Sequence, residues 1–460
     1  MNMHARLQFR SIATRFLVTS LVVVWLAGSA AAADRPPNIV MIVSDDHAWT
    51  DYSFMGHEQV RTPRLDKLAS ESLTFTRGYV PSSLCCPSLV SMITGQYPHQ
   101  HKITSNDPPL PSGKAGGKAR QDASYQAQRQ RMIGFIEDVP TLPRLLSDRG
   151  YLSLQTGKWW QGHFSRGGFT HGMSHGDAGK GGRHGDTGLE IGRKNMHPIY
   201  DFIAEAQQQQ KPFFVWYAPM LPHTPHNPPE RILAKYRDKT PSLHVAKYWA
   251  MIEWFDETCG QLLDHLNERG LSENTLVVYV TDNGWIQDPD AAKYAPRSKQ
   301  SQYDGGLRTP IMLRWPGKIE PGKSEALAMS IDLAPTLLKA AGVQSTKEMP
   351  GVNLLDERAM AGRKQIFGEC FTHNAVDIDV PATSLRWRWT IDGSTKLIVP
   401  NSANEPDAVV ELYDLAKDPF ERENLAASQP EVVAKLTKDL DAWWKPEAAA
   451  EKSKANSAAN

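Results

Sequence analysis

The segment "NIVMIVSDD" (38–46) is an apolar run that ends abruptly in polar residues. A strand with both faces buried has this unbroken apolar pattern, as in a parallel sheet covered by helices. Similar runs occur at 151–154, 213–217 and 276–281, and helical patterns at 142–148 and 245–266 lie between them. Strands that alternate with helices predict an α/β sandwich on a mainly parallel sheet, with ligands at the carboxyl ends of the strands.

The pattern changes after residue 365. Short β-like pieces, "WRWTIDGSTKLIV" and "AVVELYDL", precede an amphipathic helix whose start matches a capping box at Ser428 and Glu431. We therefore expect a small C-terminal antiparallel sheet with one helix over 366–445, followed by a disordered, charged and Ala-rich tail over 446–460. The polar stretches 106–131 and 161–188 are expected to be an exposed insertion and a long loop.

The first 33 residues have the layout of a secretory signal peptide. Arg6, Arg10 and Arg15 precede the apolar run 16–28, and small residues follow at 31–33. The run is short for a transmembrane helix, although a membrane anchor is the alternative interpretation. We expect a periplasmic or secreted protein with a catalytic domain over 34–365 and no membrane contact after cleavage.

Charge and cysteine content exclude several classes of protein. The chain has 51 basic and 51 acidic residues, and removal of the three leader arginines leaves 48 against 51. This balance predicts no nucleic-acid or membrane-surface partner. Four cysteines are too few for a disulfide scaffold, although Cys259 and Cys370 could pair.

Polar oxygen ligands follow two of the expected strands. Asp45 and Asp46 end the first apolar run, and Asp282 and Asn283 end "VVYVTDN". Alone, each pair is typical of a turn. Together, at the ends of buried strands, they suit a hard cation such as Ca²⁺ or Mg²⁺.

Cationic side chains follow the other expected strands. Lys158 follows "YLSLQTG", His223 follows "FFVWYAPMLP", and Lys299 lies shortly before "YDGGLRTP". Singly, each has an ordinary alternative as a surface lysine or a loop histidine. Near a metal, they would suit a small tetrahedral anion such as sulfate or phosphate.

Cys85 and Cys86 are adjacent and precede Pro87. Neighbouring cysteines make poor disulfide partners, and they cannot form a zinc site alone. Their segment, "CCPSLVSMITGQ", resembles the maturation motif of the formylglycine-dependent (type I) sulfatases of the alkaline phosphatase superfamily. The likeness extends in the family's order over nearly all of the mature chain, through "IVSDDH", "TGKWW", "PHTPH", "TDNGW", "KQSQYDGGLRTP", "DLAPTLLKAAG" and "LYDLAKDPFERENL".

The resemblance implies an alkaline-phosphatase-like αβα sandwich and hydrolysis of a sulfate ester, most plausibly on a sulfated carbohydrate. Cys85 takes the position that a formylglycine-generating maturation enzyme oxidises to formylglycine (3-oxoalanine). One hydroxyl of the hydrated aldehyde attacks sulfur, and the second allows sulfate to leave. Serine lacks the second hydroxyl and would stay trapped as an ester.

The resemblance also assigns roles to the other residues. A Ca²⁺ ion would be bound by Asp45, Asp46, Asp282, Asn283 and the modified Cys85. Lys158 and Lys299 would hold sulfate oxygens, and Lys299 could help to protonate the leaving oxygen. His223 would be the main acid for the leaving group.

Two positions depart from the family's pattern. The usual arginine four residues after the cysteine is Leu89, and the usual histidine after Lys-Trp is Trp160, for which His163 could stand in. These changes keep two alternatives open: a phosphodiesterase or phosphonate hydrolase of the same superfamily, and a degenerate sulfatase that only binds sulfated glycans.

Overall fold

A computed structural model of the chain describes residues 36–114, 116–177 and 181–446. The leader expected over 1–33 lies outside the described residues, as does the tail expected over 446–460 apart from Pro446. Within the described ranges, no helix combines the length and the apolar character needed to cross a membrane.

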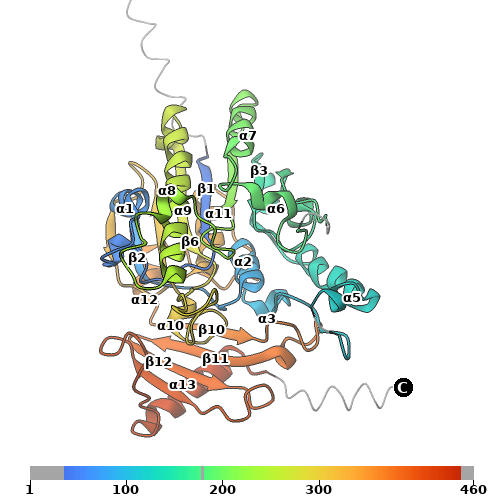
Figure 1. Cartoon of the computed structure of the whole chain (residues 1–460), viewed down its shortest axis with the longest axis vertical. Coiled ribbons are helices and arrows are strands. Elements are labelled where there is room, and N and C mark those ends of the chain that lie inside the picture. The colour runs from blue at the N-terminus through green and yellow to red at the C-terminus, as the bar shows by residue number, and fades with distance from the viewer. Residues whose placement is uncertain (1–35, 115, 178–180, 447–460) are drawn as a thin grey trace, which may run out of the picture. The chain divides into compact units, whose positions relative to one another are not determined.

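A nine-stranded sheet forms the centre of the described structure (Figure 1). Its strand order is β4-β3-β5-β1-β6-β7-β2-β8, and β9 pairs with β2. β1 lies between β5 and β6 and is parallel to both, whereas β7 is antiparallel to its two neighbours. The strands are β1 (Asn38–Ser44), β2 (Leu73–Tyr79), β3 (Leu152–Gly157), β4 (His171–Gly172), β5 (Phe213–Ala218), β6 (Thr275–Thr281), β7 (Arg308–Arg314), β8 (Gly322–Ser324) and β9 (Ala328–Met329).

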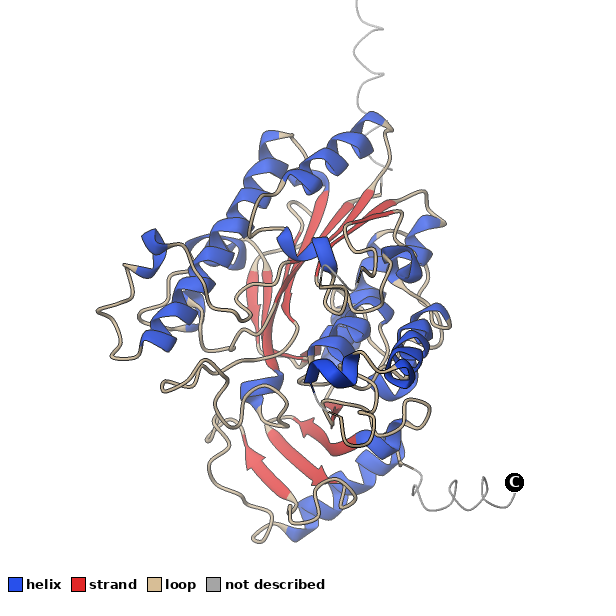
Figure 2. Cartoon of the chain, turned by 45° about the vertical axis from the view of Figure 1, so that its right-hand side comes forward, coloured by secondary structure: helices blue, strands red, loops and turns tan. Residues whose placement is uncertain are grey.

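Helices cover both faces of this sheet, as Figure 2 shows. Alternate residues of β1 pack into different clusters: Ile39, Met41 and Val43 into one, and Val40 and Ile42 into the other. The first cluster includes α2 (Cys85–Thr94), α6 (Leu142–Ser147) and α11 (Leu333–Ala340), and the second includes α1 (Pro63–Ser70), α7 (His197–Gln208) and α9 (Leu243–Glu268). The prediction of an αβα sandwich on a mainly parallel sheet is therefore confirmed.

A second, four-stranded antiparallel sheet begins at Gln365. It contains β10 (Gln365–Phe371), β11 (Leu385–Asp392), β12 (Thr395–Pro400) and β13 (Glu411–Asp414), and α13 (Pro430–Trp443) packs on it through Leu436 and Leu440. The predicted capping box is wrong. The helix begins at Pro430, and the Ser428 hydroxyl donates to the carbonyl of Leu425 instead.

The expectation of an exposed insertion over 106–131 is also wrong in part. This stretch contains α4 (Gly116–Arg120) and most of α5 (Ala123–Gly134), and Asn106, Asp107 and Arg129 are buried. The buried guanidinium of Arg129 donates to the carbonyls of Asn106 and Trp160. Long-range hydrogen bonds, which composition does not reveal, hold this polar segment against the domain.

The remaining short helices are α3 (Pro98–His101), α8 (Glu230–Leu233), α10 (Asp304–Leu307) and α12 (Glu357–Gly362). Cys259 and Cys370, for which the sequence left pairing open, are both buried free thiols.

Gly157 controls the chain's exit from β3. It has φ +75°, a conformation that favours glycine, and an added Cβ would lie 1.8 Å from the carbonyl oxygen of Ala218. The next residue, Lys158, donates its backbone N–H to this same oxygen at 2.7 Å. The close approach therefore fixes the start of the segment that carries Lys158.

We predict that Gly157→Ala lowers the free energy of unfolding by more than about 2 kcal/mol, because it adds both backbone strain and a backbone clash. Thermal or urea denaturation would measure the loss. Gly322→Ala is the matched control, since no atom lies within 4 Å of its Cβ position. Equal stability of the two variants would contradict the prediction.

Candidate functional site

The carboxyl ends of β1 and β6 bring four of the expected ligands together. Ser44 and Thr281, the last residues of these strands, are register partners, so Asp45 and Asp282 follow at the same edge of the sheet. The backbone N–H of Asp46 donates to Asp282 Oδ1 at 3.0 Å, and Asn283 Nδ2 donates to Asp46 Oδ1 at 2.7 Å. All four side chains are buried in one cluster.

Two buried lysines contact this cluster from other segments. Lys158 Nζ lies 2.8 Å from Asp45 Oδ1 and 3.9 Å from Asp282 Oδ2. Lys299 Nζ lies 2.5 Å from Asp46 Oδ1 and 3.0 Å from Cys85 Sγ. Both lysines are thus buried ion-pair partners at the sheet edge and not the solvated surface groups that they could have been.

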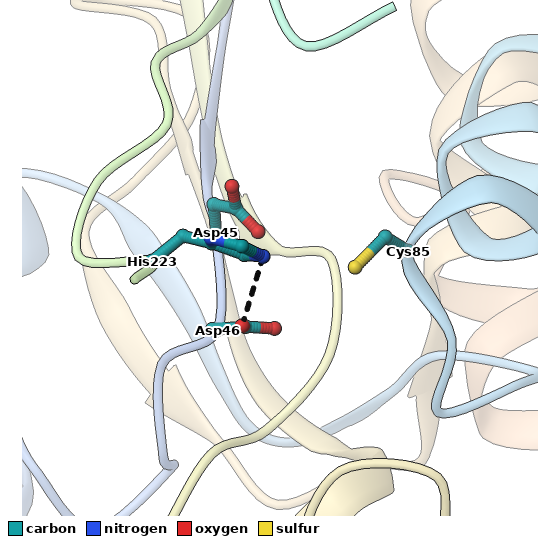
Figure 3. Close-up of side chains that lie close together, drawn as sticks. All are labelled: Asp45, Asp46, Cys85 and His223. Carbon is teal, nitrogen blue, oxygen red and sulfur yellow. Dashed lines mark ion pairs between the residues drawn. The ribbon is translucent and has the colours of Figure 1, made fainter. Parts of the chain in front are cut away.

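Cys85 and His223 complete the group from opposite sides (Figure 3). Cys85 is the first residue of α2, and its side chain points toward Asp45, Asp46 and His223 across the sheet edge. His223 Nδ1 donates to the carbonyl of Thr224 at 2.5 Å, and Nε2 lies 3.4 Å from Asp46 Oδ2. Nε2 is therefore the ring nitrogen that faces the site.

Four buried oxygen atoms of this cluster have no hydrogen-bond partner. They are Asp45 Oδ2, Asp46 Oδ2, Asp282 Oδ2 and Asn283 Oδ1, one from each expected ligand. Potential ligand atoms of Asp45, Asp46, Cys85 and His223 also lie within 4.8 Å of one another. Buried polar atoms normally have partners. Carboxylate and amide oxygens are the donors that Ca²⁺ and Mg²⁺ prefer, so the residues fit a hard divalent cation.

The pKa values of Asp45, Asp46 and Asp282 indicate that positive charge around these carboxylates is insufficient. Burial raises the pKa of Asp45 well above its ordinary value even though Lys158 is paired with it, and burial also raises the pKa of Asp282. Burial opposes ionisation of Asp46 too, but Lys299, His223 and Lys158 outweigh it and lower its pKa to about 2. The two lysines thus do not fully compensate the three carboxylates.

The same buried surroundings shift the pKa values of Lys299, His223 and Cys85. Burial disfavours the charged form of Lys299, but Asp46 outweighs this effect and raises its pKa. Burial and Lys158 hold the pKa of His223 well below its usual range. Burial raises the pKa of Cys85 to about 12. An unmodified Cys85 is therefore a neutral thiol, the less nucleophilic form of cysteine.

The two departures from the family's pattern are adjacent to this cluster. Leu89 is buried within α2 and packs in the apolar core. The buried ring of Trp160 lies beside three cations, with ring-centroid distances of 5.8 Å to Lys158 Nζ, 5.6 Å to Arg129 Cζ and 4.7 Å to Arg183 Cζ. His163, the suggested stand-in for the missing histidine, accepts from the backbone N–H of Ser165 and has no contact with the cluster among the described interactions.

Sequence reasoning missed another histidine, His184. Its ring lies 4.6 Å from that of Trp160 and 6.4 Å from that of His223. Arg183 donates to His184 Nε2 at 2.6 Å and forms a two-point ion pair with Asp107. Burial and nearby cations, Lys158 first among them, hold the pKa of His184 far below its ordinary value. The only sequence signal was the Gly- and His-rich composition of 161–188.

Comparisons with known proteins match nearly all of the described chain. The sequence model of the sulfatase family matches residues 37–343, and that of the C-terminal region of N-sulphoglucosamine sulphohydrolase matches residues 296–445.

Similar proteins point to the same family. Arylsulfatase A of Homo sapiens is 29% identical over 490 residues, which cover 91% of this chain and 89% of the relative. N-acetylgalactosamine-6-sulfatase of Canis lupus familiaris is 29% identical over 380 residues, covering 73% and 68%. A protein solved in complex with its substrate D-glucosamine-2-N,6-O-disulfate matches with a TM-score of 0.67 and 20% identity, covering 88% of this chain and 97% of that one.

The Asp107–Arg183 pair gives a prediction about stability. Burial opposes ionisation of Asp107, but Arg183 outweighs it and lowers the pKa of this carboxyl. The pair therefore stabilises the fold fully above the unfolded pKa of about 4, and its contribution disappears as the pH falls through the lowered folded pKa. We predict that Asp107→Asn loses roughly 2–4 kcal/mol at pH 7, because it leaves a partly buried guanidinium unpaired.

Denaturation at several pH values would check this, and the stability of Asp107→Asn should approach that of the wild type in acid. The control is Asp264→Asn, which breaks a solvent-exposed pair with Arg64 and should cost less than about 1 kcal/mol. A difference at Asp107 that stays constant with pH would exclude an ionic origin.

Proposed function

The chain belongs to the sulfatase family, a family of sulfuric ester hydrolases, and we propose that it releases sulfate from a sulfated carbohydrate at Cys85. The observation that carries the proposal is the placement of Cys85 beside Lys299, in a cluster that also holds Lys158 and four buried oxygen atoms without a hydrogen-bond partner. Such a site offers a nucleophile position, a place for a cation and two cationic donors for sulfate oxygens. Each element comes from a separate segment of the chain.

We propose that Asp45, Asp46, Asp282 and Asn283, with the modified Cys85, hold Ca²⁺. Their three carboxylates and the two lysines leave one net negative charge, which a divalent cation would turn into one net positive charge. When bound, Ca²⁺ would polarise the sulfate and favour ionisation of the attacking hydroxyl. A sulfate ester carries one negative charge and would then be attracted to the site.

Cys85 is the proposed position of formylglycine, which a maturation enzyme would generate. The hydrated aldehyde supplies a hydroxyl nucleophile and a second hydroxyl through which sulfate can leave. The neutral, buried thiol of the unmodified residue is poorly suited to attack. Cys86 is a poor alternative because its sulfur faces Gln161, whose Nε2 lies 3.4 Å away, and not the carboxylates.

The side chains around Cys85 take complementary parts. Lys158 and Lys299 would donate to sulfate oxygens, and these contacts position sulfur beside residue 85. Lys299 also lies close enough to residue 85 to assist proton transfer there. His223 would pass a proton from Nε2 to the leaving oxygen, since the Thr224 carbonyl fixes its Nδ1. The negative charge of a bound sulfate would offset the effect of the lysines on this imidazole.

A carbohydrate substrate is supported by relatives that act on sulfated sugars, as the names N-acetylgalactosamine-6-sulfatase and D-glucosamine-2-N,6-O-disulfate indicate for those proteins. The signal-peptide pattern over 1–33 supports export to the periplasm or the medium, where sulfated polysaccharides are accessible.

We predict that the mature protein hydrolyses 4-nitrophenyl sulfate much faster than the corresponding phosphate or phosphonate. Cys85→Ala should lose at least about 1,000-fold in kcat/KM because it removes the nucleophile, while Cys86→Ala should retain activity. Peptide mass spectrometry should find the aldehyde at Cys85 only. A protein that is active with an unmodified thiol at Cys85 would contradict the mechanism, and one that prefers the phosphonate would contradict the proposed substrate.

The metal proposal predicts a binding signal that does not depend on activity. Ca²⁺ at 100 times its Kd should stabilise the fold by about 2.7 kcal/mol and raise Tm, and a chelator should reverse the shift. Asp282→Ala should abolish the shift because it removes a ligand, whereas Asp148→Ala, at an exposed position, should preserve it. An unchanged shift in Asp282→Ala would exclude this residue as a ligand.

A further inference from the structure

We propose that the cavity beside His223 binds a second anionic group of the substrate, a sulfate or carboxylate carried by the alcohol that is released. We call it the histidine cavity. Its volume is about 650 Å³, and its lining consists of His184, Met220, His223, Thr224, Pro225, His226, His244, Lys247 and Ala292. This volume is within the range of about 300–1,000 Å³ that is typical of pockets for small ligands. The inference rests on the proposed function.

The lining favours an anion through one lysine, Lys247, and the absence of described acidic residues. The lowered pKa values of His184, His223 and His226 keep these rings neutral. The lining contains four histidines and one lysine, and no described lining residue is acidic. Lys247 projects from α9 and makes no ion pair with any described carboxylate. A free cation in a concave wall favours anionic ligands.

His226 supplies a second, independent observation. Its Nε2 is buried and has no hydrogen-bond partner. The ring is held by aromatic neighbours, with centroid distances of 5.4 Å to Tyr248 and 5.8 Å to Trp285. Burial lowers the pKa of His226 to about 4; Asp46 opposes this effect, whereas Arg193, His244 and Lys247 add to it. A buried nitrogen without a partner is costly, so His226 has hydrogen-bonding capacity that no described residue uses.

The position of His223 identifies which part of the substrate enters. His223 belongs both to the catalytic cluster and to the lining of the cavity. If its Nε2 protonates the leaving oxygen, the sugar that carries this oxygen must lie beside His223, next to the cavity that His223 also lines. The extra anionic group therefore belongs to that sugar and not to the transferred sulfate. Substrates with two anionic groups on adjacent positions or adjacent sugars fit this arrangement.

The test compares charged and neutralised forms of one substrate. From a panel of sulfated disaccharides, the one hydrolysed fastest is assayed in three forms: intact, with its uronate carboxylate reduced to an alcohol, and with its second sulfate removed. We expect loss of the recognised group to lower kcat/KM roughly 10–100-fold, mainly through KM, since charge-assisted hydrogen bonds are lost. The form that shows the loss identifies the group as a carboxylate or a sulfate.

Lys247→Gln links this loss to the cavity. It should lower kcat/KM for the intact substrate roughly 10-fold more than for the neutralised form, because the salt-like contact exists only with the former. Lys239→Gln is the matched control. Lys239 is exposed in the segment between α8 and α9 and is not part of the lining, so this variant should discriminate like the wild type.

The outcomes separate the subsite from the catalytic assignment. Equal kcat/KM for intact and neutralised substrates would overturn the subsite while leaving the sulfatase function standing. The same conclusion would follow if Lys247→Gln lowered both values equally. Failure to release sulfate from every ester, 4-nitrophenyl sulfate included, would contradict the proposed function and the subsite with it.

Discussion

The constraint on which the structure depends is the burial of three carboxylates at one edge of the sheet. Asp45 and Asp46 follow β1, and Asp282 follows β6. Because these two strands pair in parallel and end at the same register position, the three carboxylates must lie close together. Buried like charges are costly unless they are compensated, and Lys158 and Lys299 provide only two positive charges. The remaining deficit appears as raised carboxyl pKa values and as oxygens without partners. A site that is incomplete in this way would attract a cation and, once the cation is bound as we propose, an anion.

The surrounding fold keeps the lysines in register with these carboxylates. Lys158 leaves β3 through Gly157, whose closeness to Ala218 ties the segment to β5. Lys299 precedes α10 and reaches both Asp46 and Cys85, so the same ammonium group links the acidic cluster to Cys85, the proposed nucleophile position. Ordering two long side chains costs conformational entropy on folding. The compensating interactions are buried ion pairs, which hold both ammonium groups in place; in the proposed function these groups are preorganised donors for the sulfate.

The sequence predicts that these residues lie together because the patterns that indicate it are local. Apolar runs identify the buried strands, and the polar residues just beyond them mark one edge of the sheet, so Asp45, Asp282 and Lys158 could be placed without any tertiary information. The predictions that failed concern segments whose structure depends on contacts with residues far away in the sequence. Arg129 and Asp107 occur in a polar stretch typical of a surface loop, yet they are buried by contacts with the segments around Trp160 and Arg183. His184 could not be found because its relevance comes from ring contacts across the fold.

These same segments explain how the chain accommodates its two unusual positions. Leu89 removes a cation that the family's motif usually places near the nucleophile, and Trp160 replaces an imidazole with a larger neutral ring. In this fold the indole packs against Arg129 and Arg183, and His184 meets its edge. We interpret these contacts as a substitution by other parts of the chain. Arg129 and Arg183 supply positive charge, and His184 supplies an imidazole, from segments outside the family's motif. An apolar residue at 89 and an indole at 160 then fill the space in α2 and beside it, while Arg129 and Arg183 supply positive charge next to the indole.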